Sequence, residues 1–239
     1  KNKKIFHDCT RLSDKINLQR LDINQKTWSK AKEYIAGGNM LFSKRPDVFL
    51  PGKWPSYFKK AKGCTIQSLD GKKYIDVSIM GIGTNILGYS NSQIDKAVQR
   101  RVKNGNMSTL NCKEEVLLAE KLVKLHPWSD QVRFARSGGE ANAIAIRIAR
   151  AYTKKNKIAF CGYHGWHDWY LATNLRSKNN LNEHLLPGLK TGGVHKKLKD
   201  TIYPFKYNDF NGLKKLVKKH QEIGIIKMEV IRNEPPKNN

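Results

Sequence analysis

Three short segments of the chain combine glycines, aromatic rings and ionisable side chains in patterns that could hold a small anionic molecule. The first, Ser137-Gly138-Gly139-Glu140, places two adjacent glycines directly before an expected helix. The second, residues 162–169, contains two histidines between aromatic side chains. In the third, residues 227–235, charged residues follow an apolar run. Each segment is expected to follow a strand, which is where ligands bind in many sheets.

The Ser-Gly-Gly-Glu turn has the features of a phosphate-binding site. Ser137 and Glu140 have the Ser-x-x-Glu spacing of a capping box, which predicts that a helix begins here. Backbone N–H groups at Gly138 and Gly139 would then point outward at the positive end of the helix dipole, and the missing Cβ atoms would let an anion approach closely. The alternative is an ordinary strand-to-helix turn in which the glycines only relieve strain.

The aromatic segment could complete a cofactor site, because Tyr163 would lie at the carboxyl end of a strand and could stack on a flat ring. One alternative is that Trp166 and Trp169 are core anchors. Another is that His164 and His167 bind a metal, but two histidines three residues apart with no third ligand nearby make a poor zinc site. We therefore expect no metal.

The elements that must position these segments are strands that alternate with helices. We expect strands at residues 132–135, 157–161 and 223–230, and helices at residues 140–152 and 213–220. This alternation predicts an α/β sheet, with ligands beyond the carboxyl ends of its strands. Glu229 and Glu234 would then lie at the end of the last strand, as expected of a site and equally of any strand that leaves the core.

The N-terminal part is predicted to consist of helices and a hairpin. Apolar spacing predicts helices at residues 28–34, 91–102 and 114–125. Two β-rich runs, residues 65–69 and 73–77, flank Asp70-Gly71, a dipeptide that favours a tight turn in which both residues take positive φ.

The composition excludes some protein classes and leaves others open. The 45 Lys and Arg residues against 20 Asp and Glu give a net charge of +25, but 34 of the basic residues are lysines spread along the chain. A phosphate-gripping surface usually shows clustered arginines, so we prefer a basic but unspecialised surface to specific nucleic-acid binding. With 39% hydrophobic residues and no apolar run near the roughly 20 residues that span a bilayer, we expect a cytoplasmic protein outside the membrane.

The spacing of the cysteines does not suggest disulfides or a metal site. The four cysteines are far apart and contain no Cys-x-x-Cys pair: Cys9, Cys64, Cys112 and Cys161. We expect free thiols rather than disulfides or a cysteine zinc site.

In order and spacing, these motifs resemble the class III aminotransferases that use pyridoxal 5′-phosphate, particularly the glutamate-1-semialdehyde aminomutase group. The resemblance extends from about Trp28 to the end of the chain. It rests on five motifs: the Asp70-Gly71 hairpin, Leu87-Gly88-Tyr89, the Ser-Gly-x-Glu-Ala turn, Tyr163-His164-Gly165 and Met228-Glu229.

The resemblance implies an α/β fold of the fold-type-I, aspartate aminotransferase-like class of pyridoxal-phosphate-dependent transferases. The chain lacks an initial Met and ends after a strand-like run, so we expect it to be a truncated N-terminal part of such an enzyme. Residues 1–80 would be an N-terminal helix, loop and hairpin segment belonging to the small domain. Residues 81–239 would be the first part of the cofactor-binding large domain.

The resemblance further implies cofactor-binding roles for seven residues. Ser137 and the backbone of Gly138 and Gly139 would hold the phosphate. Four further residues would lie at the cofactor ring: Tyr163 stacked on it, His164 beside Tyr163, and Glu229 and Glu234 after the last strand. Gly139 stands where the family usually has Thr or Ser, which removes a hydroxyl that helps to bind phosphate.

The family's Schiff-base lysine and the Asp that pairs with the ring nitrogen are expected beyond residue 239, so we identify no catalytic residue and expect the chain alone to be inactive. The intact protein would be a homodimer that transfers an amino group from an amino donor to a keto or aldehyde acceptor, or an aminomutase. The alternatives are a family member that kept the fold and lost catalysis, and a basic nucleic-acid-binding protein.

Overall fold

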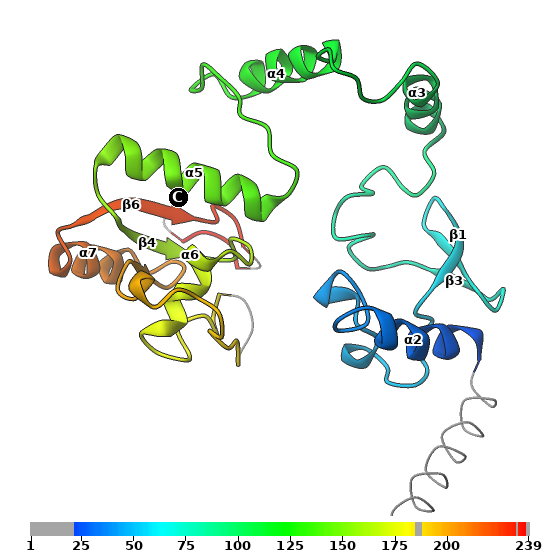
Figure 1. The fold of residues 1–239 in the computed structure, drawn as a ribbon, viewed down its shortest axis with the longest axis horizontal. Coiled ribbons are helices and arrows are strands. Elements are labelled where there is room, and N and C mark those ends of the chain that lie inside the picture. Colours follow the sequence, from blue (N-terminus) through cyan, green and yellow to red (C-terminus); the bar gives the residue numbers. More distant parts are fainter. Residues whose placement is uncertain (1–21, 185–187, 233, 238–239) are drawn as a thin grey trace, which may run out of the picture. The chain divides into compact units, whose positions relative to one another are not determined.

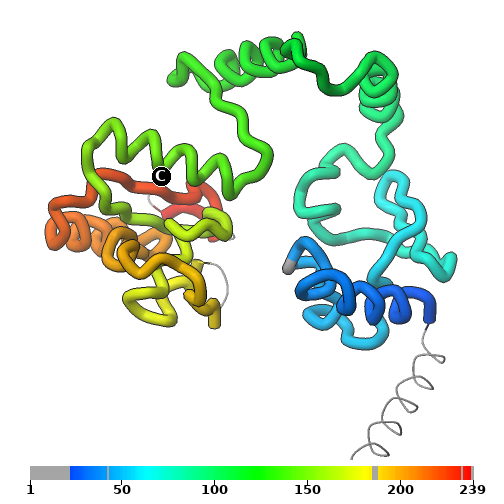
Figure 2. Tube along the Cα trace, in the orientation of Figure 1, coloured from blue at the N-terminus to red at the C-terminus, as the bar shows by residue number. Residues whose placement is uncertain are grey.

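The computed structural model describes residues 22–184, 188–232 and 234–237. The chain divides into two compact units, Lys1–Cys112 and Lys113–Asn239, and its course can be followed along the tube in Figure 2. The division at residue 80 that the resemblance implies stays a prediction, because it concerns the domains of an intact enzyme. All seven predicted site residues belong to the second unit.

The first unit begins its described part with α2 (Ile23–Tyr34). This helix starts five residues earlier than predicted because the Asp22 side chain caps it, accepting a hydrogen bond of 3.0 Å from the N–H of Gln25. Its one buried aromatic, Trp28, packs over Gly38, where a Cβ would overlap the indole ring. Two short 3₁₀ helices follow, η1 (Phe42–Lys44) and η2 (Pro46–Val48).

A three-stranded antiparallel sheet follows in the order β1 (Phe58–Lys62), β2 (Thr65–Ser68), β3 (Lys73–Ile75). The predicted hairpin is confirmed as β2 and β3, but the expected turn is wrong. Gly71 has a φ of 87° and Asp70 does not take a positive φ. The N–H of Gly71 donates to Ser68 O at 3.0 Å, as in a type I turn followed by a glycine bulge. The Asp70 carboxylate bonds the Ser68 hydroxyl and pairs with Lys72 Nζ at 2.9 Å, which stabilises this form.

Two amphipathic helices are confirmed, α3 (Ser92–Lys103) and α4 (Lys113–Leu125). Asn91 caps α3 by accepting from the N–H of Ile94 at 3.3 Å. No helix in the described residues is long and apolar enough to cross a membrane. Cys64, Cys112 and Cys161 are free thiols, and Cys9 lies outside the described residues.

The second unit contains a parallel sheet in the order β5 (Ile202–Pro204), β4 (Lys157–Cys161), β6 (Ile223–Met228). Four consecutive residues of the central strand, 158–161, are fully buried. Alternate side chains of β4 enter two clusters: Ile158 and Phe160 join Ile146 of α5 (Gly138–Thr153), whereas Ala159 and Cys161 face α7 (Phe210–Lys219). The helices therefore cover opposite faces of the sheet, as Figure 1 shows.

The predictions from the sequence were in error for three strands of this unit. Residues 132–135 pair with no strand in the described part of the chain, so the predicted strand there is wrong. Strand β5 was missed because it has only three residues and ends at Pro204. Strand β6 was predicted, but it ends at Met228, two residues earlier than expected.

Candidate functional site

The Ser-Gly-Gly-Glu turn forms the N-terminus of α5. The predicted cap is present, because the N–H of Glu140 donates to Ser137 Oγ at 3.2 Å. The reciprocal bond is shifted by one residue: the Glu140 carboxylate accepts from the N–H of Arg136 at 2.8 Å, not from that of Ser137. Among the described residues, no hydrogen bond uses the N–H of Gly138 or of Gly139. The turn thus presents two free donors at the positive end of a 16-residue helix.

The aromatic segment lies directly against this turn. A Cβ on Gly165 would be 2.7 Å from the Cα of Gly139, so residue 165 must be glycine for the two backbones to approach this closely. Gly165 also has a φ of 98°, which other residues rarely adopt. The first and second predicted segments therefore meet.

Tyr163 and its neighbours divide into exposed and buried rings. Tyr163 is 42% exposed, and its ring contacts Trp166 edge-to-face, with 6.3 Å between ring centroids. Trp169 and Tyr170 are buried, at 7% and 0% exposed. The expectation of a core anchor therefore holds for Trp169, whereas Trp166 remains 44% exposed.

His164 points into the protein. It is 3% exposed, its Nε2 donates to Cys161 O at 2.9 Å, and its ring stacks on Trp169. Burial lowers the pKa of its imidazole. No group of three or more His, Cys, Asp or Glu side chains within the described residues is arranged to hold a metal. His164 thus packs beneath the loop, and its place beside the cofactor ring stays a prediction.

His184 is a site-supporting residue that the sequence did not reveal. Its Nδ1 accepts from the N–H of Gly162 at 3.1 Å, while Tyr170 Oη donates to Gly162 O at 2.8 Å. Both polar groups of Gly162 are therefore held by buried side chains. Burial, and to a smaller extent the Arg232 charge, lower the pKa of His184 to about 4. A lone histidine in a polar stretch carries no local signal of such a role.

Glu229 lies at the end of β6 and is joined to the same loop. Its N–H donates to Cys161 O at 3.1 Å, and its side chain covers Gly162, where a Cβ would overlap the carboxylate. Arg232 Nε pairs with Glu229 Oε2 at 3.2 Å and Arg232 Nη2 donates to Glu183 O at 3.3 Å. The carboxylate is therefore neutralised and held in place.

Glu234 is not brought to this group of residues. Its neighbour Pro235 accepts from Asn208 Nδ2 at 3.1 Å, and the N–H of Lys237 donates to Asn208 Oδ1 at 3.0 Å. These bonds tie the segment to the turn before α7. No contact within the described residues links Glu234 to the other predicted site residues, so its role stays a prediction.

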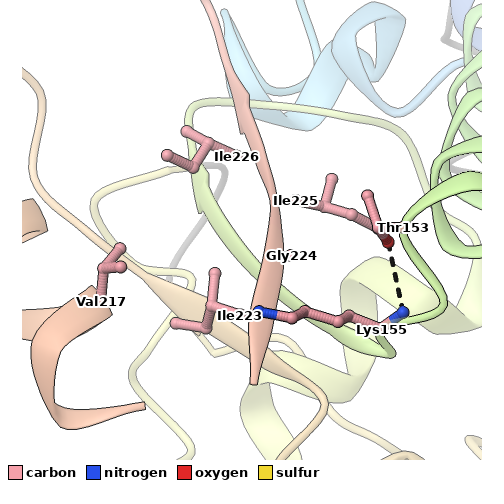
Figure 3. A pocket seen from close by; sticks show the side chains of 7 residues that line it. All are labelled: Thr153, Lys155, Val217, Ile223, Gly224, Ile225 and Ile226. Carbon is pink, nitrogen blue, oxygen red and sulfur yellow. Dashed lines mark hydrogen bonds between the residues drawn. The ribbon is translucent and has the colours of Figure 1, made fainter. Parts of the chain in front are cut away.

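A cavity of about 450 Å³ lies elsewhere in the second unit (Figure 3). Its lining residues are Thr153, Lys155, Val217 and residues 223–226. It borders the first residues of β6, whereas Tyr163 and Glu229 follow the carboxyl ends of β4 and β6. This cavity is therefore at the opposite end of the sheet from the predicted chemistry.

Comparison with known families identifies the chain. Residues 51–230 match the class III aminotransferase family. The chain belongs to this family. A 3-aminobutyryl-CoA aminotransferase from Cloacimonas acidaminovorans is 34% identical over 212 residues, which cover 88% of this chain and 46% of that protein. A glutamate-1-semialdehyde 2,1-aminomutase from Francisella philomiragia is 37% identical over 223 residues, covering 92% of this chain and 48% of that protein.

Solved structures confirm the predicted fold class. An omega-transaminase from Sphaerobacter thermophilus superposes with a TM-score of 0.75 at 25% identity, covering 90% of this chain and 50% of that structure. This class III aminotransferase chain therefore has the fold-type-I architecture. It spans about half the length of the curated relatives it matches.

Proposed function

We propose that the protein is a pyridoxal-phosphate-dependent enzyme that moves an amino group from an amino donor to a keto or aldehyde acceptor, and that this chain holds the cofactor's phosphate. The observation that carries the proposal is the pair of free N–H groups at Gly138 and Gly139, at the start of a long helix inside the family match. The similarity to the Francisella aminomutase supports an aminomutase as a second candidate.

The residues of the turn fit a phosphate group. The two N–H groups can each donate to a phosphate oxygen, and the helix dipole favours the negative charge. Ser137 Oγ already accepts from Glu140, but its hydroxyl proton remains available to donate. A Cβ on Gly138 would meet no atom within 4 Å, so the space beside its Cα is open.

The residues around the turn fit the ring of the same cofactor. Tyr163 offers a partly exposed aromatic face, and the loop below it is held by His184 and Tyr170. When bound, pyridoxal phosphate supplies the electron sink for amino-group transfer. The task of this chain would be to bind and orient it. The catalytic lysine and aspartate and the homodimer stay predictions from the resemblance, and the cytoplasmic location stays a prediction from the composition.

A proline substitution can test the phosphate-binding turn without removing the helix. Gly138 is the first residue of α5, a position that tolerates proline, and Ser137 before it is already extended with φ −142° and ψ 157°. In the full-length protein, Gly138→Pro removes one N–H donor, whereas Gly138→Ala keeps it. Affinities for pyridoxal 5′-phosphate and for pyridoxal would be measured by absorbance titration.

We expect Gly138→Pro to weaken pyridoxal phosphate binding about 10-fold or more, as for loss of a hydrogen bond to a charged group, and to leave pyridoxal binding unchanged. Gly138→Ala should bind as the wild type does. A full-length protein that binds neither compound, or a proline variant with unchanged affinity, would contradict the proposal.

A further inference from the structure

The space beside Gly139 is filled by a histidine. A Cβ built on Gly139 would lie 2.9 Å from Cδ2 and 3.1 Å from Nε2 of His167. The imidazole therefore occupies the volume that the side chain of any other residue at position 139 would enter. Gly165 makes this possible, because its missing Cβ lets the loop that carries His167 reach the turn.

The His167 ring has no other task in the described structure. The residue caps the short helix α6 (Asp168–Leu171) through its backbone carbonyl, which accepts from the N–H of Tyr170 at 2.9 Å. Its ring nitrogens take part in no hydrogen bond among the described residues. The side chain is exposed, unlike that of His164, which is turned inward. Of the two histidines in the loop, His167 alone lies against the N-terminus of α5.

We propose that His167 binds the phosphate of the cofactor through Nε2, in place of a hydroxyl on residue 139. The inference rests on the proposed function, since it assumes that the phosphate lies at the free N–H groups of Gly138 and Gly139. A ring N–H can donate to a phosphate oxygen as a hydroxyl can. The imidazole thus brings a donor to the place where Gly139 has none.

The test compares three histidine variants of the full-length protein. His167→Ala removes the donor, and His167→Gln keeps an N–H on a side chain of similar length. His195→Ala is the matched control, because His195 is also exposed and accepts only the N–H of Lys197, at 3.2 Å. Dissociation constants for pyridoxal 5′-phosphate and for pyridoxal would be measured, together with the ³¹P resonance of the bound phosphate.

We expect His167→Ala to weaken pyridoxal phosphate binding about 10-fold. It should leave pyridoxal binding unchanged and move the ³¹P resonance. His167→Gln should restore most of the affinity, and His195→Ala should match the wild type. Adding Gly139→Ser to His167→Ala should also recover affinity, because the freed space admits a hydroxyl.

Two results would overturn the inference while the proposed function stands. In one, Gly138→Pro weakens phosphate binding but His167→Ala does not. In the other, His167→Ala tightens binding, which would mean that the imidazole obstructs the phosphate. A wild-type protein that binds pyridoxal no less tightly than pyridoxal phosphate would overturn both, because no phosphate subsite would then exist.

Discussion

The two segments that meet at Gly139 and Gly165 are built in opposite ways. The turn before α5 is held by two bonds of a shifted capping box, and it leaves its glycine N–H groups free. The loop after β4 is held from below by buried side chains, with both polar groups of Gly162 bonded to His184 and Tyr170. The turn before α5 thus offers backbone N–H donors to a ligand, whereas the buried contacts of the loop after β4 fix the positions of its aromatic rings.

Because the two segments are built differently, we expect substitutions in them to affect phosphate binding and folding stability to different extents. Substitutions in the turn should change affinity for a phosphate more than they change folding. Substitutions beneath the loop should mainly change folding, because they remove buried contacts. The following variants test that separation through the free energy of unfolding, from the largest expected effect to the smallest.

Phe160→Ala should have the largest effect. Phe160 is fully buried, and its ring lies 5.1 Å from that of Tyr170 and 5.0 Å from that of His184, measured between centroids. Removing the ring leaves a cavity under the loop, which should cost about 3–5 kcal/mol in urea denaturation. Tyr163→Ala, on the exposed side of the same loop, should cost less than about 1 kcal/mol. Equal costs would remove the distinction between the two sides.

Acid should destabilise the loop through His184. Its pKa is lowered by burial from 6.5 to about 4, so between these pH values the unfolded chain binds a proton that the folded chain does not. Stability from the neutral ring is complete above about pH 6.5 and falls toward pH 4, by up to about 1.4 kcal/mol per pH unit. Urea midpoints between pH 4 and 7 would show this slope. His184→Gln should reduce it, and an unchanged slope would contradict the assignment.

Gly165→Ala should cost about 2 kcal/mol, because alanine strains a backbone with φ 98° and its Cβ would push against Gly139. Gly193→Ala is the matched control: Gly193 has a φ of 86° but no atom within 4 Å of its Cβ position, so only the backbone strain of about 1 kcal/mol applies. Thermal denaturation of both variants gives the difference. Equal losses would mean that the contact with Gly139 is not tight.

Ser137→Ala should have the smallest effect, about 1 kcal/mol, because it removes only the side-chain cap of α5. Ser137→Thr keeps the hydroxyl and should stay within about 0.5 kcal/mol of the wild type. Urea denaturation compares the two. If the threonine variant lost as much as the alanine variant, the capping bond would not be the cause.

The parts of the fold that were predicted correctly carry local signals. The buried run of β4 and the capped start of α5 are visible in a few consecutive residues. The mistakes concern features decided by distant partners. Strand β5 exists because it pairs with β4, and residues 132–135 are not a strand because no neighbour pairs with them. The predicted turn type at Asp70 was wrong because the dipeptide pattern takes no account of the bond between the Asp70 carboxylate and the Ser68 hydroxyl.

The candidate site divides in the same way. The free N–H groups of Gly138 and Gly139 follow from a local pattern. The inward turn of His164 and the support from His184 depend on what the fold packs around them. The approach of His167 to Gly139 joins residues 28 positions apart in the sequence, and no periodicity reports such a contact.

The contact between the two glycines also has a consequence for how this sequence can change over evolution. A side chain at position 139 would displace His167, and a side chain at position 165 would force the two backbones apart. The residue at 139 is therefore coupled to the residue at 167, whereas position 165 is restricted to glycine by the backbone of residue 139. A hydroxyl residue at position 139 would therefore require the imidazole at position 167 to move or to be replaced. Contacts in the fold thus restrict which residues these three positions can hold, although no two of the positions are adjacent in sequence.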